Sequence, residues 1–530
     1  MNNHLKRTGE IIMYGLLGER LGHSYSKIIH ESMGYEYHLI EKAPHELKDF
    51  IRRRDFSGLN VTIPYKKEVI KYCDEISELA ERIGAVNTLY YDSTDKLIGT
   101  NTDYTGLSYA LTQAKISLKG RHVLILGGTG GAGSMVKILA QDLGASKITI
   151  VSRGQTKSNR QYSSVNTADA IQHVASDQYA DAIQHVASDQ YAIDDATCPI
   201  SITTYDTLPK DAEIIINATP VGTYPDITKS PVSLKNFKNC VGVCDLIYNP
   251  LRTELLMQAA ELGIPYTNGL PMLVRQATAA ADFFHKRCIA SSQENSYKQN
   301  RSQHDSDRNN IDRRISEHVS SVHQNSDRNN IDRCISEHVN SVHQNFDRNT
   351  SGENSFSSLT PVILKNLIRD TENVVITGMP GCGKSTIGSK LARKTGRRFV
   401  DTDETVKEMY GRTPAEIIKH DGEEIFRKME EKAVLSLAKE HSLVIATGGG
   451  VVTRPANVRH LKQNGRIFFV DRDPDKLSTY NRPLSQNGGV YLIYERRYPI
   501  YCSTCDHQIK NNSDDFNDAL SVIYGMMYND

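Results

Sequence analysis

Neither sign of charge dominates this chain of 530 residues: Lys and Arg number 63, as do Asp and Glu, and the formal net charge is zero. This balance argues against a protein that binds nucleic acid through a general basic field. No apolar run approaches the roughly 18–20 residues that span a bilayer, and the N-terminus lacks the zones of a signal peptide. The nine cysteines are scattered and odd in number, which does not suit a disulfide framework. We therefore expect a soluble protein of a reducing, cytoplasmic compartment, with no membrane or nucleic-acid partner.

Hydrophobic residues make up only 38% of the chain, which suggests that part of its length is not core. Residues 11–288 and 371–530 alternate short Val/Ile/Leu runs with longer amphipathic stretches, as α/β domains do. Within residues 289–370, the stretch 291–358 contains no proline and one glycine and is dominated by polar residues. Such a composition buries too little apolar surface to offset the entropy of ordering it. We expect two folded units joined by a disordered, low-complexity linker.

Two tandem duplications interrupt this pattern. Residues 306–325 recur as 326–345 with two differences, and residues 169–180 recur unchanged as 181–192. Each linker copy carries Ile and Val at helical spacing, so a partner-binding or coiled-coil helix is one interpretation. Duplication of a tolerated segment is the favoured one, because the stripe is narrow and the repeat is not a multiple of seven. The second duplication predicts an exposed loop outside any active site.

A glycine-rich turn in the first unit predicts a dinucleotide site. The apolar run 122–126 precedes glycines that fit GxGxxG, and a helical pattern follows them. Such glycines allow a tight turn and let backbone N–H groups approach a pyrophosphate at a helix N-terminus. The next strand run ends in Ser152 and Arg153, where an NAD-preferring fold usually has an acid, so a 2′-phosphate and NADP(H) are favoured. The expected cofactor-binding residues are Gly128, Gly130, Gly131, Gly133, Ser152 and Arg153.

The rest of the first unit carries four spaced polar motifs and a C-terminal one: His23–Ser26, Asn60–Lys66, Gly84–Thr88, Gly99–Asp103 and Gly269–Gln276. Together they resemble the shikimate dehydrogenase family over nearly all of residues 11–288. The resemblance implies reduction of 3-dehydroshikimate to shikimate with NADPH. It also implies a substrate domain at 11–105 plus 270–288, and a Rossmann-type NADP domain at 106–269.

The resemblance also implies roles for single residues. Lys66 and Asp103 match the catalytic pair at the reacting oxygen, which suits a carbonyl oxygen that must gain a proton as hydride arrives. Lys27 departs from the family, which usually has proline at this position, and this concerns loop geometry more than chemistry. The residues that match substrate ligands are Ser24, Ser26, Thr62, Asn87, Tyr248 and Gln276.

The second unit opens with a phosphate-binding loop. An apolar strand run at 374–377 leads into a complete GxxxxGK[ST] motif and then a helical pattern. In such loops backbone amides cradle the phosphates, the lysine reaches the β- and γ-phosphates, and the hydroxyl after it ligates Mg²⁺. The motif predicts ATP binding through Gly378, Gly381, Gly383, Lys384, Ser385 and Thr386.

Five further motifs, in order, resemble shikimate kinase across residues 371–530: Phe399–Asp403, Gly422–Glu430, Thr447–Gly450, Arg482–Leu484 and Arg497–Tyr501. The resemblance implies that Asp401 helps Ser385 hold Mg²⁺ and that Asp403 orients or deprotonates the attacking hydroxyl. A planar guanidinium suits a carboxylate, and the substrate contacts implied are Asp403, Arg427, Gly448, Gly449, Gly450 and Arg497. Arg482, which opens a glycine-containing lid, is expected to neutralise charge on the transferring phosphoryl group.

The two halves predict consecutive reactions, because the product of the first is the substrate of the second. We therefore interpret the chain as a bifunctional enzyme of the shikimate pathway, acting on small molecules with NADP(H), ATP and Mg²⁺. Two alternatives stay open at this point. One half could have become a binding or regulatory module, or the first half could be an NAD-linked quinate or shikimate oxidiser. The sequence does not decide the oligomeric state or whether the halves touch.

Overall fold

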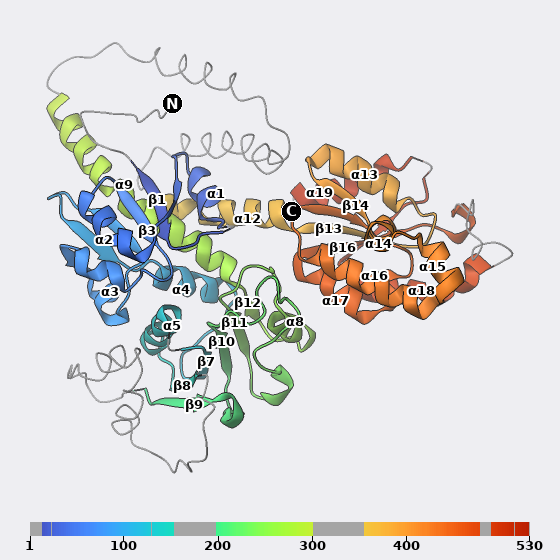
Figure 1. The fold of residues 1–530 in the computed structure, drawn as a ribbon, viewed down its shortest axis with the longest axis horizontal. Helices are drawn as coiled ribbons and strands as arrows, with labels where there is room; N and C mark the ends of the chain where they lie inside the picture. Colours follow the sequence, from blue (N-terminus) through green and yellow to red (C-terminus); the bar gives the residue numbers. More distant parts are fainter. Residues whose placement is uncertain are drawn as a thin grey trace.

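The computed structural model describes most of the chain and places three β-sheets along it (Figure 1). The duplicated segments at 169–192 and 306–345 lie outside the described residues, as do His23, Arg153 and Arg482. None of the described helices is long and apolar enough to cross a membrane. The residues described are 13–22, 24–128, 130–152, 198–299, 355–477, 489–513 and 515–528.

The first sheet is mixed and has the order β2-β1-β3-β5-β6-β4. Its strands are β1 (Tyr14–Gly18), β2 (His38–Glu41), β3 (Gly58–Val61), β4 (Glu75–Ile76), β5 (Thr88–Tyr91) and β6 (Leu97–Thr100). Leu17, Leu59, Leu89 and Leu97 alternate into one fully buried cluster, which is why these short runs form strands rather than loops. The helical elements around it are α1 (Ser26–Glu31), α2 (Pro44–Arg53), η1 (Glu68–Tyr72) and α3 (Glu78–Ile83).

The second sheet is parallel throughout and has the order β12-β11-β10-β7-β8-β9. Its strands are β7 (His122–Leu126), β8 (Lys147–Ser152), β9 (Ile200–Thr204), β10 (Ile214–Asn217), β11 (Gly242–Asp245) and β12 (Tyr266–Thr267). The strand order reverses between β7 and β10, and in open α/β sheets ligands bind beyond the carboxyl ends of strands at such a point. The helical elements are α5 (Gly131–Asp142), η2 (Tyr205–Thr207), η3 (Leu234–Asn236) and α8 (Glu254–Glu261).

Two helices connect these sheets. α4 (Asp103–Gln113) leads from the first sheet to the second, and α9 (Gly269–Gln299) returns to the first. They pack closely, because a β-carbon placed on Gly106 of α4 would lie 2.5 Å from the Met272 carbonyl oxygen of α9. α9 also packs against α1 and β5, so this helix pair joins the two domains.

The third sheet is also parallel, with the order β14-β15-β13-β16-β17. Its strands are β13 (Asn373–Thr377), β14 (Arg398–Asp401), β15 (Leu443–Ala446), β16 (Gly465–Asp471) and β17 (His507–Lys510). Helices cover both faces, as parallel sheets require (Figure 1). They are α13 (Lys384–Thr395), α14 (Thr402–Tyr410), α15 (Pro414–Asp421), α16 (Glu423–Ala438), α17 (Pro455–Asn464), α18 (Gly489–Thr504) and α19 (Asn517–Tyr528), with short turns η5 (Val451–Thr453) and η6 (Pro474–Lys476).

The predicted fold class is confirmed: an α/β protein with a two-domain N-terminal unit and a C-terminal parallel-sheet domain. Part of the segment that we expected to be a disordered linker is folded instead. The turn η4 (Phe356–Leu359) and helix α12 (Thr360–Thr371) form ordered structure within residues 289–370. Their apolar residues Leu359, Ile363 and Leu367 are buried, and burial of such a stripe is what stabilises a short helix.

Candidate active sites

Lys66 and Asp103 meet at the carboxyl ends of strands in the first sheet. Lys66 lies in the turn after β3, and Asp103 is the first residue of α4, directly after β6. Lys66 Nζ lies 2.5 Å from Asp103 Oδ2, and the two side chains are 22% and 14% exposed. The Asp103 backbone N–H donates to Asn101 Oδ1 at 3.1 Å, which fixes the start of the helix. The predicted pair therefore forms a partly sheltered ion pair that an incoming substrate can still reach.

A buried polar cluster lies beside this pair. Asn87 Oδ1 accepts hydrogen bonds from the Thr102 backbone N–H at 2.7 Å and from Thr88 Oγ1 at 3.0 Å. Asn87 Nδ2 lies 3.5 Å from Gln276 Oε1, which also accepts from Thr102 Oγ1 at 3.4 Å. Gln276 comes from α9, 189 residues away along the chain from Asn87. The structure thus brings two predicted substrate ligands together, and it adds Thr102, which no motif had assigned a role.

Three other predicted ligands lie around α1. Ser24 Oγ donates to Ser26 Oγ at 3.1 Å and accepts from the Ser26 backbone N–H at 3.2 Å. Tyr25, between them, contacts Tyr248 with ring centroids 5.4 Å apart. Burial raises the pKa of Tyr248, so its hydroxyl stays protonated and can donate. Thr62 follows β3, and its backbone N–H donates to the Leu17 carbonyl at 2.9 Å.

The glycine loop after β7 has the shape expected for a dinucleotide. Gly127 has φ of +82°, a backbone conformation that favours glycine. A β-carbon on Gly133 would lie 2.4 Å from the Gly128 Cα, so α5 packs against the strand end only because Gly133 has no side chain. A β-carbon on Gly130 or Gly131 would meet nothing within 4 Å, which leaves their backbone open to a ligand. These residues fit a pyrophosphate at the start of α5.

The base of the second sheet carries a buried carboxyl that the motifs had not singled out. Asp245, the last residue of β11, is fully buried. Its oxygens accept from Thr253 Oγ1 at 2.6 Å and from Asn217 Nδ2 at 3.0 Å. Burial raises the pKa of Asp245 to about 7, against the lowering effect of these donors. Asp245 thereby links β10, β11 and the start of α8.

In the third sheet the predicted phosphate loop wraps the start of α13. Gly378 and Gly383 have φ of +148° and +101°, which L side chains rarely adopt. Lys384 is 9% exposed, and its ammonium donates to the carbonyls of Gly378 and Met379, each at 3.0 Å. Ser385 Oγ donates to Asp401 Oδ2 at 2.8 Å. A hydroxyl and a carboxylate form the oxygen donor set that Mg²⁺ prefers, so these two residues fit the metal.

Asp403 and Arg427 lie against the glycines 448–450, a segment that approaches Pro380 of this loop. A β-carbon on Gly448 would lie 2.5 Å from Asp403 Oδ1, and one on Gly450 would lie 2.4 Å from an Arg427 nitrogen. Both side chains therefore need glycines opposite them. Burial, reinforced by the neighbouring Asp401, raises the pKa of Asp403 against the lowering effect of Lys384 and Arg427.

Arg427 is held by a buried acid that the sequence interpretation overlooked. Glu430 is 1% exposed, and its Oε2 lies 2.8 Å from Arg427 Nη1. Burial raises the pKa of Glu430, although Arg427 opposes the shift. The signal was present, since residues three apart on a helix lie on one face. On the far side, Arg497 Nη1 and Tyr501 OH both donate to the Gly449 carbonyl, at 3.0 and 2.5 Å.

Each half of the chain matches the model of a known protein family. The model of the "Shikimate dehydrogenase substrate binding domain" matches residues 16–89, and that of "Shikimate kinase" matches residues 380–524. The first range contains Lys66 and Asn87, and the second contains Lys384 and Asp403.

Individual relatives match the first half over nearly their whole length. A shikimate dehydrogenase (NADP(+)) of Shouchella clausii is 35% identical over 285 residues, which is 52% of this chain and 93% of that protein. One of Halothermothrix orenii is 35% identical over 50% of this chain and 88% of its own length. A solved shikimate dehydrogenase of Peptoclostridium difficile is 31% identical, with 55% of this chain and 99% of that chain covered and a TM-score of 0.41.

The sequence matches carry the assignment, and the predicted resemblance is confirmed in both halves. Through its N-terminal half the chain belongs to the shikimate dehydrogenase family, and through its C-terminal half it carries a shikimate kinase domain.

Proposed function

We propose that this chain reduces 3-dehydroshikimate to shikimate with NADPH and then phosphorylates shikimate to shikimate 3-phosphate with ATP. The observation that carries the first activity is the sheltered Lys66–Asp103 ion pair beside the buried Asn87–Gln276 cluster. The second rests on Asp403 and Arg427, which lie against Gly448 and Gly450 next to the loop that holds Lys384. The shared metabolite makes the two sites consecutive steps of one route.

In the reduction, Lys66 supplies the proton. When bound, NADPH would supply the hydride for the new C–H bond, so that the carbonyl oxygen takes up the π electrons and needs a proton. The Lys66 ammonium donates its proton to that oxygen, and Asp103, 2.5 Å away, orients the ammonium. A general acid within hydrogen-bond reach is worth roughly 10²–10⁴ in rate.

Polar groups on the substrate domain hold the ring. The Ser24 and Ser26 hydroxyls, 3.1 Å apart, are paired donors for the carboxylate. Asn87 lies directly before β5 of the first sheet and Gln276 lies on α9, and their amides suit the ring hydroxyls. Because these amides are already aligned by Thr102 and Leu273, little ordering is required when the ring binds. Thr62 and Tyr248 complete the set.

In the phosphorylation, the residues around the phosphate loop divide the work. Lys384 and the loop amides hold the phosphates of ATP, and Ser385 and Asp401 would hold Mg²⁺, which neutralises phosphate charge when bound. Asp403 orients the attacking hydroxyl and accepts its proton, and its raised pKa makes it a stronger base than an ordinary carboxylate. Arg427 and Arg497 pair with the carboxylate, and Arg482 neutralises charge on the transferring group.

Two separate assays test this proposal. NADPH oxidation should depend on 3-dehydroshikimate, and ADP release should depend on shikimate, in the same purified chain. Quinate with NAD⁺ serves as the competing substrate pair for the first half. Reduction of 3-dehydroshikimate with no phosphorylation of shikimate, or the reverse, would assign one half a role other than catalysis.

A further inference from the structure

A short loop of the dehydrogenase unit is bonded to the kinase domain through its backbone. The loop comprises residues 249–254, between β11 and α8, and we refer to it as the docking loop. The Leu251 N–H donates to Asn464 Oδ1, and the Arg252 N–H donates to the Gln463 carbonyl, both at 2.8 Å. Asn464 and Gln463 end α17 of the kinase domain and are fully buried. Buried backbone groups satisfied across two units indicate a built interface rather than a chance contact.

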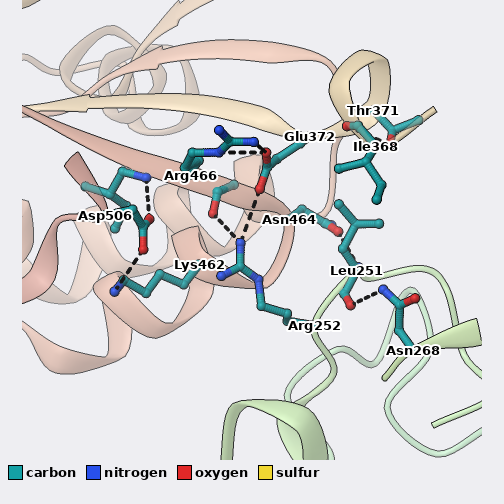
Figure 2. A network of polar contacts seen from close by, with 12 residues as sticks. Leu251, Arg252, Asn268, Ile368, Thr371, Glu372, Lys462, Asn464, Arg466 and Asp506 are labelled. Atoms are coloured by element: carbon teal, nitrogen blue, oxygen red, sulfur yellow. Dashed lines mark hydrogen bonds and ion pairs between the residues drawn. The ribbon is translucent and has the colours of Figure 1, made fainter. Parts of the chain in front are cut away.

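Arg252 reaches further into the kinase domain. Its Nη2 donates to the Gly465 carbonyl at 3.0 Å and lies 3.3 Å from Glu372 Oε1. Glu372 is 12% exposed, and its other oxygen binds Arg466 at 2.8 Å, so one sheltered carboxylate bridges two guanidinium groups (Figure 2). The Leu251 carbonyl accepts from Asn268 Nδ2 at 2.7 Å, which ties the same loop back to the dehydrogenase unit.

Further charged and polar pairs surround the contacts of Leu251 and Arg252. Arg459 of α17 binds both oxygens of Glu254, at 2.6 and 2.7 Å, and also contacts Glu261. Gln463 Nε2 donates to the Ile227 carbonyl at 2.7 Å. Each of these bonds joins a dehydrogenase residue to a kinase residue. The contacts therefore continue from the docking loop onto α8.

A second contact lies on α9, where η4 and α12 pack against the dehydrogenase unit. Asp282 of α9 accepts from the Phe356 N–H at 2.6 Å and from Ser355 Oγ at 2.8 Å, so it caps η4 across the contact. Thr278 Oγ1 and Thr360 Oγ1 lie 2.8 Å apart, both buried. The buried apolar cluster beneath contains Ile29, Met33, Leu251, Leu270, Val274, Ala277, Ala281, Leu359, Ile363 and Leu367. One helix before β13 thus anchors the kinase domain to the helix that carries Gln276.

The docking loop is continuous with the dehydrogenase site. The ring of Tyr248, the residue before it, contacts the ring of Tyr25 at a tilt of 45°, and Tyr25 lies between Ser24 and Ser26 at the start of α1. Thr253, within it, donates to the buried Asp245 at 2.6 Å. Because the kinase domain holds the two N–H groups between these residues, any movement of the domain displaces the chain that carries Tyr248.

We propose that the kinase domain is docked on the dehydrogenase unit and that Arg252 acts as a positioning residue, holding Tyr248 in the dehydrogenase substrate site. The positioning part rests on the proposed role of Tyr248 in substrate binding. The effect is one-sided, since Lys384, Asp403 and Arg427 have no bonds to the docking loop among the contacts described. Loss of the contacts between the docking loop and the kinase domain should therefore weaken reduction of 3-dehydroshikimate and leave phosphorylation of shikimate unchanged.

Hydrogen exchange in the full chain tests, independently of activity, whether the docking loop is bonded to the kinase domain. The Leu251 and Arg252 amides should be protected in the wild type, and Arg252→Glu, which sets two carboxylates against each other at Glu372, should speed their exchange roughly tenfold or more. Arg252→Lys, which keeps the charge, should restore most of the protection. Lys238→Glu, an exposed charge reversal in the same unit, is the matched control. If the wild-type amides exchange as fast as those of Arg252→Glu, the docking loop is not bonded to the kinase domain and this part of the proposal is wrong.

Kinetics on the same variants test the positioning. In Arg252→Glu the KM for 3-dehydroshikimate should rise roughly fivefold or more, the low end of coupling between sites, with the NADPH KM and the kinase constants within about twofold. Should Arg252→Glu not fold, Arg459→Glu breaks the same interface from the kinase side. Faster amide exchange with an unchanged KM would overturn the positioning role. A wild-type chain that does not reduce 3-dehydroshikimate would instead refute the proposed function, while the exchange result still decides the dock.

Discussion

The two sites are assembled in different ways. In the kinase site, Lys384, Asp403 and Gly448 follow β13, β14 and β15, three adjacent strands of one sheet, and helices that pack on the same domain add Arg427 and Arg497. The dehydrogenase residues come from two sheets: Lys66 and Asn87 from the first, the glycine loop and Tyr248 from the second, and Gln276 from the helix between them. One core fixes the kinase site, whereas the dehydrogenase site depends on how two domains are held relative to each other.

The charged side chains of the two sites also differ in how far they are exposed. Glu430 is buried and Asp403 half-buried, and burial raises the pKa of both carboxyls. Lys66 and Asp103 keep 22% and 14% of their side chains exposed. A site between domains stays open to its substrate, and in exchange its geometry is sensitive to contacts elsewhere. The docking loop is one such contact, so the comparison predicts that distant changes affect reduction more than phosphorylation.

The largest expected effect comes from the proton donor. Lys66→Met should lower dehydrogenase turnover roughly 10²–10⁴-fold, because the developing alkoxide loses its acid. The kinase rate should be unchanged, since its site is built on another sheet. Lys67→Met, at the exposed neighbouring lysine, provides the control. NADPH oxidation at saturating 3-dehydroshikimate measures the change, and near wild-type turnover would remove Lys66 from the mechanism.

A loss of kinase activity is expected when the lysine of the phosphate loop is replaced. Lys384→Ala should reduce phosphorylation roughly 10²–10³-fold, the cost of one charged donor in a site that excludes water. Reduction should continue at the wild-type rate. Lys419→Ala removes an exposed lysine from the same domain as a control. If Lys384→Ala also slowed the dehydrogenase, the kinase site would not be self-contained and the comparison would fail.

A moderate effect is expected on cofactor choice. Arg153 follows β8 but lies outside the described residues, so its role stays a prediction. If it pairs with the 2′-phosphate, Arg153→Ala should raise the KM for NADPH roughly 10–150-fold, as expected for loss of about 1.5–3 kcal/mol. The KM for NADH should change little. Equal changes with both cofactors would show that Arg153 does not contact the 2′-phosphate.

The smallest effect concerns stability of the dehydrogenase unit. Asp245 has a pKa near 4 in an unfolded chain and about 7 when buried, so the folded state binds more protons between these values. Stability should therefore fall as pH rises from about 4 to about 7, by at most about 1.4 kcal/mol per unit. Asp245→Asn should flatten this decline. Pulse proteolysis in urea at pH 5 and pH 7, with Asp49→Asn as the exposed control, measures it; equal slopes in wild type and variant would contradict it.

Much of each site could be predicted because the motifs follow strands. Lys66, Asn87 and Asp103 are recognisable in short segments, and parallel or neighbouring strands bring their ends together. Glu430 and Thr102 were overlooked, since neither is distinctive outside its fold: one is a helix acid, the other a threonine whose role depends on Asn87.

The dock between the halves could not be predicted. Leu251 and Arg252 lie 213 positions from their respective partners Asn464 and Gly465 along the chain, and the two segments form no pattern with each other. The average composition of residues 289–370 also hid the short apolar stripe of α12, because the polar repeats outweighed Leu359, Ile363 and Leu367. Long-range polar pairing depends on where two surfaces meet, which local periodicity does not encode.

The most direct test of the two-enzyme account is a single reaction with the purified chain, 3-dehydroshikimate, NADPH and Mg-ATP, in which NADP⁺ and shikimate 3-phosphate are quantified together. The account predicts that one shikimate 3-phosphate accumulates for each NADPH oxidised, that leaving out ATP stops the sequence at shikimate, and that leaving out NADPH yields no product. NADPH oxidation without any shikimate 3-phosphate, with ATP present and shikimate accumulating, would contradict it.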